Sequence, residues 1–179
     1  MLANYGNPFE AKQLRPLNLG PLDVLVVDDN PQIRELLVTI LDALHVKHIR
    51  EATDGDAGFK EVCASPPDIV LTDWVMEPVS GVELVRRIRQ SEKSPNPFLP
   101  VIMITSSCSS TEVIEARDAG ISEFLVKPIT PKALYERIVA LVERPRPFIR
   151  TKTFFGPCRR QDRQAGYGGP ERRRDGDGR

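Results

Sequence analysis

The chain has 179 residues, of which 40% are hydrophobic and 28% are charged, and its formal net charge is zero. This length suffices for one well-packed domain and is short for two domains of ordinary size. No apolar run reaches the length of a membrane span, and residues 1–20 lack the order of a secretory signal. We therefore expect a cytoplasmic protein without a membrane-spanning segment.

The charge is distributed unevenly along the chain. Residues 144–179 hold 11 Lys and Arg against 4 Asp and Glu, a charge of +7, so residues 1–143 carry −7. The basic segment is rich in Arg, Pro and Gly and has few apolar residues, so we expect residues 144–179 to be a disordered tail. The folded domain is expected at 22–143, after an N-terminal extension at 1–21. The three cysteines are odd in number and widely spaced, which predicts neither a disulfide framework nor a zinc site.

Short apolar runs alternate with longer amphipathic segments from Asp23 onward, as in α/β proteins with a parallel sheet. The predicted strands are Val24–Val27, His48–Glu51, Ile69–Thr72, Val101–Thr105 and Glu123–Val126. Helices are expected from Pro31, over Gly55–Ala64 and Gly81–Gln90, after Ser110 or Thr111, and from Pro131. Asn30 and Thr130 precede helix-initiating prolines as caps. Five such pairs predict a doubly wound, five-stranded parallel sheet with five helices on its two faces.

Reactive side chains stand where these strands end. The first strand ends in Asp28 and Asp29, the third in Asp73, the fourth in Thr105 and the fifth in Lys127. In open α/β sheets the functional crevice lies beyond the carboxyl ends of the strands, so these side chains are expected to converge. Three carboxylates would repel one another without a hard cation, which predicts a Mg²⁺ site. A carboxylate held there beside an ammonium group can attack a phosphoryl group.

The sequence resembles the receiver domains of two-component signalling over about residues 22–143. The resemblance rests on Asp28-Asp29, on Leu-Thr-Asp73-Trp-Val-Met with Gly81 eight residues on, on Thr105-Ser and on Lys127-Pro-Ile. It implies the flavodoxin-like strand order 2-1-3-4-5. The chain departs from the family in the loop after Asp73, where proline stands at position 78 rather than 77.

The resemblance also implies a role for each residue. Asp73 would be the phosphoacceptor, and Mg²⁺ would be bound by Asp28, by Asp29 most directly, by Asp73 and by the main-chain carbonyl of Val75. Thr105 would be the switch hydroxyl and Phe124 its aromatic partner, while Lys127 would begin a cis peptide with Pro128. The expected function is phosphoacceptor signalling rather than enzymatic turnover, with a histidine kinase or histidine phosphotransfer protein upstream and a protein target downstream.

Several alternatives compete with this interpretation. Taken singly, adjacent aspartates are common helix caps, and Thr105 or Lys127 could be an ordinary surface residue. A haloacid-dehalogenase-like phosphatase would also use an aspartyl phosphate, Mg²⁺, Thr and Lys, but it requires Asp-x-Asp on the first strand, where this chain has adjacent aspartates. The arginines of the tail could bind nucleic acid, although their charge alone is a weak signal.

Overall fold

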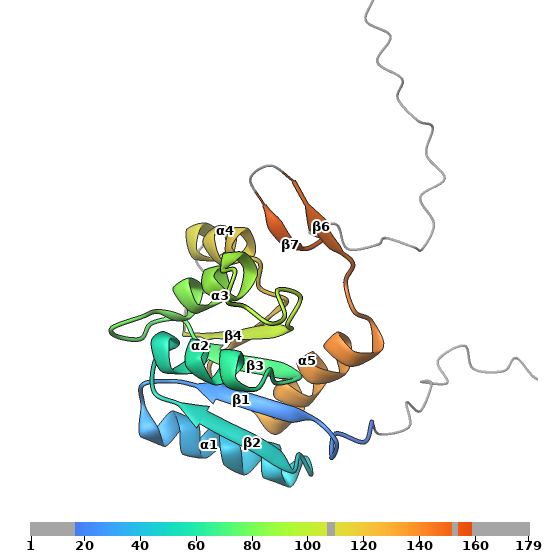
Figure 1. The fold of residues 1–179 in the computed structure, drawn as a ribbon. Coiled ribbons are helices and arrows are strands. Elements are labelled where there is room, and N and C mark those ends of the chain that lie inside the picture. Colours follow the sequence, from blue (N-terminus) through green and yellow to red (C-terminus); the bar gives the residue numbers. More distant parts are fainter. Residues whose placement is uncertain (1–16, 107–109, 152–153, 159–179) are drawn as a thin grey trace, which may run out of the picture.

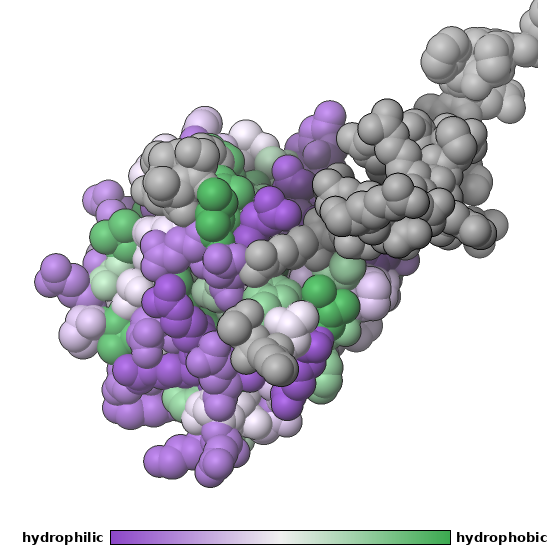
Figure 2. Space-filling model, turned by 90° about the horizontal axis from the view of Figure 1, so that it is seen from above, coloured by the Kyte–Doolittle hydropathy of each residue, from purple (hydrophilic) through white to green (hydrophobic). Residues whose placement is uncertain are grey.

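A computed structural model describes residues 17–106, 110–151 and 154–158 of the chain. It shows a parallel sheet covered by helices on both faces, with a small hairpin beyond the last helix (Figure 1). No helix within these ranges is long and apolar enough to cross a membrane. The surface seen in Figure 2 is mainly hydrophilic, and its apolar residues form separate patches.

The strands and helices alternate as predicted. The strands of the main sheet are β1 (Asp23–Val27), β2 (His48–Ala52), β3 (Ile69–Asp73), β4 (Val101–Thr105) and β5 (Glu123–Val126). The helices are α1 (Pro31–Ala43), α2 (Gly55–Ala64), α3 (Gly81–Gln90), α4 (Ser110–Ala119) and α5 (Pro131–Glu143). The sheet is parallel with the order β2-β1-β3-β4-β5, which confirms the predicted architecture.

Side-chain caps fix the starts of the helices. The Asn30 side chain accepts hydrogen bonds from two amides of the first turn of α1, and Pro31 occupies its first position. The Asp54 carboxylate does the same at α2, and the Thr130 hydroxyl accepts from the Ala133 amide at α5. These caps satisfy amides that have no partner inside the helix. These three helices begin within a few residues of the ends of β1, β2 and β5.

The hydrophobic core forms two layers, one on each face of the sheet. Alternate residues of β1 show the division, because Val24 and Val26 pack with α1 and α5, whereas Leu25 and Val27 pack with α2 and α3. This alternation follows from the two-residue repeat of a strand. The central strands β3 and β4 are buried along their whole length, which explains their nearly continuous apolar sequence.

The described end of the N-terminal extension packs on the α1 and α5 layer. Leu19 is only 1% exposed, and Leu17 lies partly buried against the same core. The Leu17 amide also donates a hydrogen bond to the Tyr135 hydroxyl of α5 at 3.0 Å. Residues 17–19 are thus part of the folded unit, although the sequence placed them in an extension.

The C-terminal segment differs from the sequence-based expectation. Residues 144–179 were expected to be disordered, but β6 (Phe148–Arg150) and β7 (Phe155–Pro157) form an antiparallel hairpin. The hairpin lies beside α3 and α4 (Figure 1). Tertiary contacts explain the difference, because its phenylalanines pack on the domain rather than on each other alone. The prediction for 159–179 lies outside the described residues.

Candidate functional site

Asp73, the last residue of β3, is the centre of the site. Its side chain is largely buried, and both carboxylate oxygens are engaged. The Lys127 ammonium group donates to Oδ1 at 2.7 Å, and the Val75 amide donates to Oδ2 at 3.0 Å. These contacts hold the carboxylate in one orientation at the end of the central strand. Such fixed orientation is what a nucleophile needs.

Lys127 is held in place by the end of the sheet. It follows β5, and its amide donates to the Thr105 carbonyl at 2.8 Å, which continues the pairing between β4 and β5. The Lys127–Pro128 peptide is cis, as the resemblance implied. A second cis peptide joins Glu77 to Pro78, which the sequence did not lead us to expect.

The two neighbouring aspartates occupy different environments. Asp28 is only 1% exposed, whereas Asp29 is exposed. The Asn30 amide donates to Asp28 Oδ1 at 2.9 Å, but Oδ2 is buried and has no hydrogen-bond partner among the described residues. The Arg34 guanidinium donates to the main-chain carbonyl of Asp28 at 2.9 Å rather than to its carboxylate.

Burial raises the pKa of Asp28 above its ordinary value of 3.8, and the negative charges of Asp73 and Asp29 raise it further. The Asn30 amide and the Lys127 charge oppose this shift. The structure therefore brings the three acids close enough to interact. A buried acceptor without a donor, beside other carboxylates, fits a hard cation that prefers oxygen ligands. No group of three or more acidic, histidine or cysteine side chains in the described ranges forms a ready-made metal cage.

Gly81 shapes the floor of the site. A Cβ atom at this position would lie only 2.0 Å from the Asp73 carbonyl oxygen and 2.9 Å from Thr72 Oγ1. The Gly81 amide donates to the Trp74 carbonyl at 3.2 Å, which closes the loop between β3 and α3. Only glycine permits α3 to begin this near to the phosphoacceptor candidate. The spacing of eight residues in the sequence thus has a steric origin.

Thr105 and Phe124 lie on neighbouring strands and on the same face of the sheet. The register pairs Met103 with Phe124 and Thr105 with Val126. Thr105 is 5% exposed, whereas Phe124 is partly buried against the α2 and α3 layer. Opposite residues of paired strands point to the same side, so Thr105 and Phe124 are diagonal neighbours. Because the two side chains are neighbours, a movement of Thr105 would change the space available to the Phe124 ring.

Sequence reasoning missed one supporting residue. Arg34 links the first turn of α1 to the acidic pair through the carbonyls of Asp28 and Asp29, and its Nε atom pairs with Glu51 at 3.2 Å. A lone arginine on a helix gives no sequence signal for such a contact, which depends on the packing of α1 beside β2. Cys108 lies outside the described residues.

Comparison with known proteins agrees with this geometry. A family model described as the response regulator receiver domain matches residues 24–139. The chain belongs to the response-regulator receiver family. Every candidate site residue of this receiver domain, from Asp28 to Lys127, falls inside the matched range, whereas the hairpin falls beyond it. Family membership removes the haloacid-dehalogenase-like alternative.

Individual relatives each match about two thirds of this chain. The chain is 32% identical to the chemotaxis protein CheY of Pseudomonas aeruginosa over 123 residues, which are 69% of this chain and 98% of that protein. It is also 32% identical to the chemotaxis protein CheY1 of Helicobacter pylori, covering 65% of this chain and 94% of that one. A putative response regulator from Chloroflexus aurantiacus superposes with a TM-score of 0.64 at 27% identity, covering 69% of this chain and 99% of its own.

Proposed function

We propose that this receiver domain is a phosphorylation-controlled signalling protein in which Asp73 accepts a phosphoryl group from a histidine kinase or a histidine phosphotransfer protein. The observation that carries this proposal is the 2.7 Å contact between Lys127 and Asp73, together with the buried Oδ2 atom of Asp28, which has no hydrogen-bond partner in the described part of the chain. A carboxylate oxygen of Asp73 forms the new bond to phosphorus, while the phosphorus–nitrogen bond of the donor phosphohistidine breaks. The imidazole leaves and retains a proton on one nitrogen.

The Mg²⁺ ion required for this chemistry would be held by the carboxylates of Asp28, Asp29 and Asp73 and by the main-chain carbonyl of Val75. When bound, it supplies positive charge that offsets the three acids and the phosphoryl oxygens. Lys127 already supplies a positive charge in contact with Asp73, and the Val75 amide donates to the same carboxylate. Both groups are hydrogen-bond donors beside Asp73 and can donate to phosphoryl oxygens.

The signal would travel from Thr105 to Phe124. The Thr105 hydroxyl donates to a phosphoryl oxygen, and Phe124 turns into the space that the threonine leaves. Their position on one face of adjacent strands supports this coupling. Phosphorylation then shifts a pre-existing equilibrium between two states rather than creating a new fold. A protein target reads the change on the face formed by α4, β5 and α5.

The proposed unit of phosphorylation is residues 22–143, acting in the cytoplasm between a kinase or phosphotransfer protein and a downstream protein. Autodephosphorylation is slow in this proposal, because the apolar Val75 side chain stands beside Asp73 and is 70% exposed at the mouth of the site. An apolar group there hinders the approach of water to the phosphoryl-aspartate.

The fluorescence of Trp74 offers a direct test, because it is the only tryptophan of the chain and follows Asp73. Titration with Mg²⁺ should change its emission in a saturable way, and a small acyl phosphate should change it again only when Mg²⁺ is present. Asp73→Asn should abolish the second change. A response to the acyl phosphate that survives in this variant or in excess chelator would show that another group accepts the phosphoryl.

A further inference from the structure

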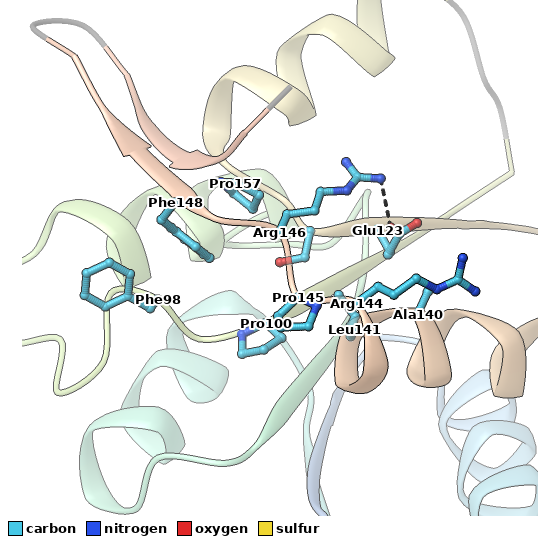
Figure 3. A pocket seen from close by; sticks show the side chains of 11 residues that line it. Phe98, Pro100, Glu123, Ala140, Leu141, Arg144, Pro145, Arg146, Phe148 and Pro157 are labelled. Atoms are coloured by element: carbon cyan, nitrogen blue, oxygen red, sulfur yellow. Dashed lines mark hydrogen bonds and ion pairs between the residues drawn. The ribbon is translucent and has the colours of Figure 1, made fainter. Parts of the chain in front are cut away.

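The C-terminal hairpin encloses a pocket at the end of the sheet opposite to Asp73. Pro100, just before β4, lies at its floor, and Ala140 and Leu141 of α5 form one side. Phe148 and Pro157 of the hairpin close the other side (Figure 3). The pocket therefore exists only because residues beyond the matched receiver segment fold back onto the domain.

The hairpin wall is firmly attached. The rings of Phe148 and Phe155 each pack edge-on against Phe98, with centroids 5.2 and 5.3 Å away. The buried Arg89 guanidinium lies 5.1 Å from the centroid of Phe148 and donates to the carbonyls of Gly120 and Pro97. Cation–π and aromatic contacts of this kind add to the apolar area that the hairpin buries. These contacts fix the hairpin on the domain, so the wall of the pocket is an ordered part of the fold.

The size of the pocket limits what it can hold. Its volume is about 250 Å³, and its lining is mainly apolar. Pockets for drug-sized ligands are usually about 300–1,000 Å³, whereas an apolar cavity of about 150 Å³ already holds benzene. The space therefore fits one aromatic or large aliphatic side chain and is small for a nucleotide or another large cofactor.

The rim of the pocket is basic. Arg146 pairs with Glu123 at 2.9 Å, and Arg137 reaches the same carboxylate at 3.5 Å, so two cations share one acid (Figure 3 shows the Arg146 contact). Arg144 is exposed beside them at the end of α5 and has no ion pair within the described ranges. The excess positive charge favours an acidic occupant.

The same charge argues against the protein's own C-terminus as the occupant. Residues 159–179 hold seven arginines against four acidic residues, a net charge of +3. A basic segment would be repelled by Arg144 and by the shared pair at Glu123. An acidic segment of another protein meets both requirements, because its charges match the rim and one apolar side chain fills the pocket.

We propose that this pocket is a docking site for an acidic segment of a partner protein, which inserts one aromatic or large aliphatic side chain between α5 and the hairpin. The site is separate from Asp73 and does not require phosphorylation. In other protein interfaces, too, one buried side chain contributes much of the affinity while a polar rim surrounds it.

The test uses the full ¹⁵N-labelled chain and a five-residue peptide with a central phenylalanine flanked on each side by Asp and Glu. Amide shifts should move for Ser122, Glu123, Leu141 and Phe148 and should saturate. A peptide with serine in place of phenylalanine, and one with lysines in place of the acids, should each shift these amides much less.

Two variants separate the pocket from a general charge effect. Ala140→Trp fills the cavity and should abolish the shifts, and Arg144→Glu should weaken binding by roughly fivefold, as expected for a rim charge. Lys47→Glu, an exposed reversal on the loop before β2, should leave binding unchanged. All three variants should keep the wild-type amide spectrum away from the substitution, which shows that they fold.

Retention of peptide binding by both Ala140→Trp and Arg144→Glu would overturn the proposal. Movement of the pocket amides on deletion of residues 159–179 would overturn it in favour of the protein's own tail. Shifts that depend on protein concentration without peptide would overturn it in favour of a second copy of the chain.

Discussion

Replacement of Asp28 by asparagine should stabilise the metal-free protein. The Asp28 side chain is 1% exposed, and its Oδ2 atom is buried without a hydrogen-bond donor among the described residues. Asparagine keeps the shape and the acceptor that binds the Asn30 amide, but it removes the buried charge. The uncharged amide avoids the cost of burying a charge and the repulsion by Asp73 and Asp29. We expect Asp28→Asn to raise the free energy of unfolding by about 1–2 kcal/mol, the ordinary size of a charge effect in a folded protein.

The effect should depend on pH in a defined direction. Because the pKa of Asp28 is raised in the folded state, the native protein binds this proton more tightly than the unfolded chain. The penalty is absent below the ordinary value of 3.8 and develops as the pH rises through the pKa of the folded state. The difference in stability between the variant and the wild type should therefore be small in acid and full at pH 7.

Thermal unfolding in chelator, followed by circular dichroism, measures this difference. At pH 7 the midpoint of Asp28→Asn should lie about 3–6 °C above that of the wild type. Asp29→Asn is the matched control and should change the midpoint less, because Asp29 is exposed. Added Mg²⁺ should stabilise the wild type and narrow the gap, since the ion binds the native state. A variant that unfolds earlier than the wild type in chelator would refute this account of the buried charge.

Further substitutions test other parts of the structure. Gly81→Ala should lower the free energy of unfolding by about 3 kcal/mol, because its Cβ would collide with the Asp73 carbonyl; an unchanged urea midpoint would contradict the close approach. Asp54→Ala should cost about 1 kcal/mol at neutral pH through loss of the α2 cap. This cost should fade as the pH drops through the lowered pKa of Asp54, in urea melts at several pH values. Phe148→Ala should cost about 2 kcal/mol, half the usual value for a fully buried phenylalanine, and leave labelling of Asp73 intact. Thr105→Ala should still accept the phosphoryl group but lose the coupled amide shifts of β5; shifts on phosphorylation that are equal in Thr105→Ala and in the wild type would refute the coupling.

The main fold could be predicted from the sequence because local and tertiary signals agree. Asn30 with Pro31 caps the first helix, and the apolar runs of β3 and β4 match their complete burial. The candidate site followed from topology, since parallel strands deliver Asp73 and Lys127 to one edge. The close contact between these two side chains confirms the expected proximity.

Other features depend on contacts that the sequence does not reveal. The hairpin has the composition of a disordered tail, and its stability comes from distant residues such as Arg89 and Phe98. The contrast between buried Asp28 and exposed Asp29 depends on where β1 ends against its neighbours. Composition and periodicity carry no information on either point.

Mass spectrometry of the intact protein after incubation with a small acyl phosphate tests the central claim most directly. With Mg²⁺, we expect a mass increase of one phosphoryl group, located by peptide fragmentation to Asp73, and no increase in chelator or in Asp73→Asn. A phosphoryl group on any other residue, or one that is added equally well without divalent ions, would contradict the assignment of Asp73 as the phosphoacceptor.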